Sequence, residues 1–82
     1  MITVTLLTRA GCGSCDRVAA QIRPVVAAEA ARLEIRDVDA GDGAEAVEFG
    51  DRVPVVLVEE EEIACWEIDD EELIEAIRDA RG

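Results

Sequence analysis

The sequence contains no histidine and no tyrosine, and its eight basic residues are all arginine. The absence of histidine excludes imidazole as a catalytic base, proton shuttle or metal ligand. The absence of lysine excludes Schiff-base chemistry and the lysine of a phosphate-binding Walker loop. Trp66 and Phe49 are the only aromatic residues, so the chain lacks the stacking platforms on which single-stranded nucleic acids bind.

Size and charge narrow the function classes further. The 82 residues are expected to form one small domain that spans residues 1–82. Twenty acidic and eight basic residues give a net charge of −12, which argues against nucleic acid or an anionic membrane as a partner. No run approaches the ~20 apolar residues of a membrane span, and no signal peptide opens the chain. We expect a cytoplasmic protein that acts as a monomer.

The three cysteines are Cys12, Cys15 and Cys65. An odd count does not suit the disulfide framework of a secreted domain. In the reducing cytoplasm, a close cysteine pair more often serves redox chemistry or metal binding than a structural bridge. One chain with no second cysteine pair and no histidine cannot complete a zinc site of four nitrogen and sulfur ligands. Redox chemistry is therefore favoured, and a metal cluster shared between two chains stays open.

Hydrophobic periodicity and turn residues predict seven secondary-structure elements. Alternating apolar residues indicate strands, and apolar residues three and four apart indicate helices. Pro24 lies inside the first helical pattern and must bend that helix or split it, and we expect a bent helix. Asp69, with Glu72 three residues later, predicts a capping box at the start of the last helix. The predicted strands are 2–7, 33–38, 54–58 and 63–66, and the predicted helices are 14–31, 44–49 and a last one that opens at residue 69.

The order β-α-β-α-β-β-α predicts an α/β fold. The first two strands flank a helix and should be parallel, joined by a right-handed crossover. The last two strands are too close in sequence for a crossover and should form a hairpin, with the acidic run 59–62 as its solvated tip. The continuous apolar run 54–58 should be a central strand that is buried on both faces. We expect a four-stranded mixed sheet with helices on both faces.

The segment Cys12-Gly13-Ser14-Cys15 lies between the first strand and the first long helix. A cysteine just before a helix N-terminus faces unpaired N–H groups and the positive end of the helix dipole. Both favour the thiolate, and such sites lower a cysteine pKa from ~8.5 to roughly 3.5–7.5. Cys12 is thus the expected nucleophile, which forms a mixed disulfide that Cys15, one turn into the helix, resolves.

Together with Val53-Pro54 before a later strand, this cysteine motif resembles the thioredoxin superfamily, and over the whole chain the bacterial glutaredoxin-like domain family. The resemblance implies a cis Val53–Pro54 bond beside the cysteines, with the Val53 backbone pairing with an extended substrate. It implies a small thiol–disulfide oxidoreductase that reduces mixed disulfides of proteins or low-molecular-weight thiols. No bound cofactor is implied, and glutathione or another small thiol such as mycothiol would be the co-substrate. The expected substrate-binding residues are Arg9, Gly13, Ser14, Arg52, Val53, Pro54 and Asp69.

Several alternatives stay open at this point. The fold could serve as a binding adaptor with unused cysteines, or as an iron–sulfur carrier dimer that uses Cys12 and an external thiol. Cys65 is either a small buried hydrophobe or a further redox group. Trp66 either packs at the base of the last helix or forms a wall of the substrate groove. Arg9 and Arg52 are either substrate ligands or solvated charges, and Asp69 can be simply an N-cap.

Overall fold

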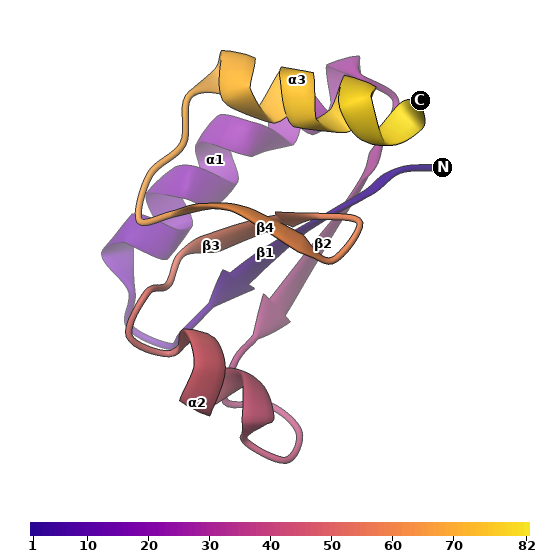
Figure 1. Cartoon of the computed structure of the whole chain (residues 1–82). Helices are drawn as coiled ribbons and strands as arrows, with labels where there is room; N and C mark the ends of the chain where they lie inside the picture. Colours follow the sequence, from indigo (N-terminus) through magenta and orange to yellow (C-terminus); the bar gives the residue numbers. More distant parts are fainter.

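The computed structural model describes all residues, 1–82, as one α/β unit (Figure 1). No helix in it is long and apolar enough to cross a membrane. Three helices and four strands follow one another in the predicted order. They are β1 (Thr3–Thr8), α1 (Gly13–Ala28), β2 (Arg32–Asp37), α2 (Ala44–Phe49), β3 (Val55–Val58), β4 (Glu61–Cys65) and α3 (Asp70–Arg81).

The four strands form a single mixed sheet in the order β2-β1-β3-β4. β1 runs parallel to β2, as the crossover through α1 predicts, and antiparallel to β3. β3 and β4 form the expected antiparallel hairpin. β3 is central, and all four of its residues are buried. This arrangement confirms the predicted topology.

Helices cover both faces of the sheet (Figure 1). On one face α1 and α3 pack side by side, and their buried residues, Cys15 excepted, join Val4, Leu6, Val56 and Val58 in the larger core cluster. On the other face α2 contributes Ala46 and Phe49 to a smaller cluster. Alternate residues of the strands therefore point into two separate apolar cores, one on each face of the sheet, which is typical of a sheet that packs between helices.

The β3–β4 hairpin turns through two glutamates. Glu59 and Glu60 both have positive φ, 50° and 70°, as a two-residue type I′ turn demands. Both side chains are used. The Glu59 carboxylate accepts a hydrogen bond from the Thr3 N–H at 2.9 Å, and Glu60 pairs with Arg36 at 3.3 Å. The tip is exposed, as predicted, but these contacts tie it back to β1 and β2.

The first helix ends earlier than predicted. α1 is a single helix that contains Pro24, as expected, but it ends at Ala28 rather than at residue 31. Pro24 has no N–H to donate, so the carbonyl of Ala20, four residues earlier, lacks its helical partner. Both residues are exposed, and water can therefore bond to that carbonyl. The helix stops because Ala30 adopts φ 54° and the Ala31 N–H donates to the Val26 carbonyl at 3.0 Å. This is a Schellman-type end, in which alanine stands where glycine is usual.

Other element boundaries shift by one or two residues. β1 and β2 cover 3–8 and 32–37 instead of 2–7 and 33–38, and β4 covers 61–65 instead of 63–66. β4 ends because Trp66 adopts φ 71°. Asp69 is the N-cap of α3 with extended backbone, but its side chain makes no capping hydrogen bond. The predicted capping box is therefore wrong, and the Asp69 carboxylate stays free.

Candidate redox site

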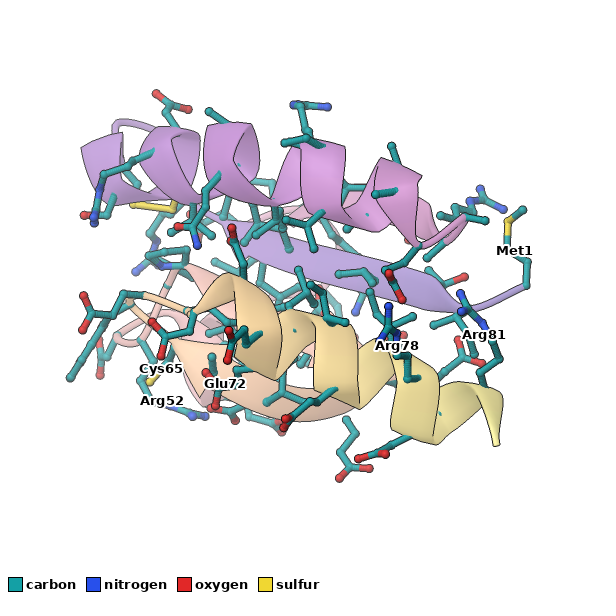
Figure 2. All side chains as sticks on the ribbon, turned by 90° about the horizontal axis from the view of Figure 1, so that it is seen from above. Met1, Arg52, Cys65, Glu72, Arg78 and Arg81 are labelled. Carbon is teal, nitrogen blue, oxygen red and sulfur yellow. A yellow bond between two sulfur atoms is a disulfide. The ribbon has the colours of Figure 1, made fainter.

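A disulfide joins Cys12 and Cys15 at the N-terminus of α1 (Figure 2). Cys12 is the N-cap residue, with extended backbone at φ −92° and ψ 103°. Its Sγ accepts a hydrogen bond from the Cys15 N–H at 3.1 Å. One of the otherwise unpaired N–H groups of the first helical turn therefore points at this sulfur. The same N–H can stabilise negative charge on Cys12 once the disulfide is opened.

The two sulfurs differ in access to solvent. Cys12 is half-buried, whereas Cys15 is 3% exposed and belongs to the core side of α1. Gly13 and Ser14 between them are exposed, so nothing in the chain covers the outer side of this turn. An incoming thiol or disulfide can thus reach Cys12, while Cys15 is reached only from within the motif.

Val53 and Pro54 lie at the same end of the sheet as the cysteines. Val55 pairs with Leu7 in antiparallel register, which puts Pro54 beside the end of β1, from which the chain leads to Cys12. The Val53–Pro54 bond is cis, as the resemblance implies. No hydrogen bond within the chain uses the backbone N–H or carbonyl of Val53. These two groups are available to an extended segment.

Arg9, three residues before Cys12, is held by groups on the α2 side. Its Nε and Nη2 donate to both carboxylate oxygens of Asp39 at 2.9 Å, and its Nη1 donates to the Gly50 carbonyl at 3.2 Å. The bonds from Arg9 hold the pKa of Asp39 below its usual value. A substrate role for Arg9 would require these contacts to open. The sequence did not indicate Asp39 or Gly50 as its partners, because they are distant along the chain.

Arg52 is also engaged. It forms an ion pair with Glu62, donates to the Glu48 carbonyl at 3.2 Å and lies 5.2 Å from the centre of the Phe49 ring. The hydrogen bond to Glu62 raises the pKa of Arg52 above its usual value. Cys65 lies close to Arg52 (Figure 2) and packs half-buried against the smaller core cluster.

Trp66 closes the same end of the sheet. Its backbone N–H donates to the Pro54 carbonyl at 2.7 Å, yet the residue is 59% exposed. It therefore does not pack as a buried base of α3. The following residues lead to α3, whose start is fixed by Gln21 of α1. The Gln21 amide donates to the Ile68 carbonyl at 2.7 Å and to an Asp70 carboxylate oxygen at 2.9 Å.

The topology thus brings the cysteine pair, Val53-Pro54 and Trp66 to one end of the molecule, and Asp69 lies on the connection to α3. The side chains of Arg9 and Arg52 instead form ion pairs within the chain, with Asp39 and Glu62. Gln21 is a positioning residue that was not predicted from the sequence, because a lone glutamine on a helix carries no pattern. No cluster of three or more cysteine, aspartate or glutamate side chains is arranged to hold a metal ion. Geometrically, the arrangement can exchange thiols for disulfides at an accessible Cys12.

Comparison with solved structures agrees with this fold. Thioredoxin 1 from Thermosipho africanus superposes with a TM-score of 0.67 at 20% identity, covering 96% of this chain and 93% of that one. A structure described as a malarial protein superposes with a TM-score of 0.68 at 15% identity, covering 96% of both chains. At these identities the likeness shows a thioredoxin-like fold.

Sequence relatives are closer. Uncharacterized protein Mb0520 of Mycobacterium bovis and Uncharacterized protein Rv0508 of Mycobacterium tuberculosis are each 42% identical over 74 residues, which covers 85% of this chain and 76% of theirs. Residues 3–78 match the family described as Glutaredoxin-like domain (DUF836). With its cysteine pair at the N-terminus of α1 and its thioredoxin-like fold, this chain belongs to the glutaredoxin-like domain family.

Proposed function

We propose that the protein is a thiol–disulfide oxidoreductase that reduces disulfides through Cys12 and Cys15. The observation that carries the proposal is the disulfide at the N-terminus of α1, with the Cys15 N–H bonded to the Cys12 sulfur at 3.1 Å. A sulfur held in this way is a good nucleophile in the reduced protein and a good leaving group in the oxidised one.

The reaction has two steps. The Cys12 thiolate attacks one sulfur of the substrate disulfide, forms a mixed disulfide and releases the other substrate sulfur as a thiolate, which takes up a proton. Cys15 then loses its proton and attacks the Cys12 sulfur, which releases the second substrate thiol. Two electrons pass from the dithiol to the substrate, and the Cys12–Cys15 disulfide is left. An external dithiol, or two thiols of the glutathione type, would return the protein to the reduced state.

The burial of the two sulfurs supports this division of roles. Cys12 is half-buried and can meet a substrate, whereas Cys15 is 3% exposed. A substrate would lie extended along Val53, whose backbone N–H and carbonyl are unused within the chain. Gly13 and Ser14 would face the substrate from the other side, since both are exposed.

The test is a disulfide-reduction assay with dithiothreitol as the electron donor. Wild type should accelerate reduction, and Cys12→Ser should bring the rate down to that of dithiothreitol alone, because no other thiolate is positioned to attack. Once reduced and freed of dithiothreitol, Cys15→Ser mixed with the substrate disulfide should accumulate the mixed disulfide at Cys12, detectable as a mass increase. Cys65→Ser is the matched control and should retain activity. Equal activity of wild type and Cys12→Ser would overturn the proposal.

A further inference from the structure

The charges near the disulfide are distributed unevenly. Six carboxylates lie on the connection from β4 to α3 and on the first turns of α3: Glu67, Asp69, Asp70, Glu71, Glu72 and Glu75. None of them forms an ion pair. The ion pairs of the molecule instead use Arg9, Arg36, Arg52, Arg78 and Arg81 elsewhere. We call the six carboxylates the acidic face.

The acidic face adjoins the redox site. A shallow hollow of about 350 Å³ lies between the first turns of α1 and the start of α3, and Arg17, Gln21, Glu67, Asp69 and Glu72 are among its lining residues. Arg17 is two residues after Cys15 and is the only basic residue of this hollow. In Figure 2 the start of α3 and Glu72 lie at the same end of the molecule as the N-terminus of α1. Three carboxylates against one arginine give this hollow a net negative charge.

Trp66 provides an apolar contact at the same place. The residue is 59% exposed, and its backbone N–H is bonded to the Pro54 carbonyl. Trp66 immediately precedes Glu67 of the acidic face. An exposed indole beside carboxylates binds a cationic side chain well, because the ring face attracts the cation and its alkyl stem packs on the ring.

We infer that the protein partner of the redox site is a polypeptide segment with arginine or lysine close to its disulfide cysteine, an inference that rests on the function proposed above. The free backbone groups of Val53 fit an extended polypeptide. The acidic face repels an anionic thiol and attracts a basic segment. Trp66 supplies the anchor for one of the cationic side chains. The substrate class is thus a cationic protein disulfide rather than an anionic small-molecule one.

Two synthetic peptide disulfides test this inference. The peptides are identical except that lysine or glutamate flanks the cysteine on both sides, and each is oxidised to its homodimer. The measured quantity is the rate constant for oxidation of the reduced full-length protein, divided by that of dithiothreitol with the same peptide. This division removes the intrinsic effect of peptide charge on disulfide reactivity. We expect the lysine peptide to react about tenfold faster at low ionic strength, with the preference shrinking as salt rises.

A pair of matched variants locates the effect. Glu67→Gln combined with Glu72→Gln should reduce the lysine preference about threefold, because it removes two charges from the acidic face. Glu61→Gln combined with Asp79→Asn removes two exposed, unpaired charges at the other end of the molecule and should leave the preference unchanged.

The outcomes separate the two proposals. Equal normalised rates for the two peptides, with both forming the Cys12–Cys15 disulfide, would overturn the inferred partner and leave the oxidoreductase intact. An equal change of the preference in both double variants would likewise overturn the inferred partner alone. Failure of every peptide to oxidise Cys12 would overturn the oxidoreductase itself, and the inferred partner with it.

Discussion

The two ends of α3 use charge in opposite ways (Figure 2). At the C-terminal end, Arg78 donates through Nε and Nη2 to Glu29 of α1 at 3.0 and 3.1 Å, and Arg81 also contacts Glu29. At the N-terminal end, Asp70, Glu71 and Glu72 form no ion pair. The acidic residues there suit the positive end of the helix dipole, but no arginine forms an ion pair with them.

The charges at the C-terminal end of α3 stabilise its packing, whereas most of those at its N-terminal end face solvent. The C-terminal ion pairs join α1 to α3 far from the cysteines. Near the cysteines, α3 is held by Leu73 in the core and by the hydrogen bonds from Gln21. Apart from Asp70, which accepts one of these hydrogen bonds, the carboxylates at that end do not hold the helix in place, and they remain available to set the potential around Cys12.

The largest expected effect concerns Leu73, which is fully buried in the larger core cluster. Leu73→Ala should lower the free energy of unfolding by about 2–5 kcal/mol, because it removes apolar contacts and leaves a cavity. Denaturation in urea measures this loss. Val47→Ala is the control, since Val47 is 90% exposed, and should change stability by less than about 0.5 kcal/mol. A loss for Leu73→Ala as small as that of the control would mean that packing does not hold this end of α3.

A smaller effect is expected from the ion pairs at the other end. The hydrogen bond from Arg78 lowers the pKa of Glu29 in the folded protein. A lowered folded-state pKa stabilises the fold at pH values above the unfolded value of ~4.3, and this contribution is lost as the pH falls through the folded-state value. Glu29→Gln should therefore lower the melting temperature at pH 7, and its deficit relative to wild type should vanish on acidification below pH ~4.

The same experiment on the other end of α3 sharpens the contrast. Glu72→Gln removes one carboxylate that has no ion-pair partner, so its melting temperature at pH 7 should stay much closer to that of wild type. If Glu72→Gln and Glu29→Gln lowered the melting temperature equally, the two ends would not differ in the way the contacts indicate.

The topology and much of the site were predictable from local patterns. The β-branched run of β3, the short helix before Gly50 and the cysteine pair ahead of an alanine-rich helix each carry a signal within a few residues. The cis Val53–Pro54 bond followed from the family resemblance. These features depend on residues adjacent in sequence, or on a motif read as a unit.

What the sequence did not predict depends on contacts between distant residues. The partner of Arg9 is Asp39 and the partner of Arg52 is Glu62, and with 20 acidic residues available the sequence offers no way to choose between them. The end of α1 was misplaced because Ala30 adopts a left-handed conformation without being glycine. The predicted capping box does not form, because the Asp69 side chain makes no hydrogen bond to the helix.

The proposed chemistry depends on α1 holding the Cys12 sulfur as a reactive anion. It can be measured through the pH dependence of iodoacetamide alkylation at Cys12, followed by mass spectrometry of the freshly reduced protein. A thiolate stabilised by the helix N-terminus should give a rate that rises with an apparent pKa between roughly 3.5 and 7.5. An apparent pKa at or above the free-cysteine value of ~8.5 would contradict this and would favour a binding adaptor with unused cysteines.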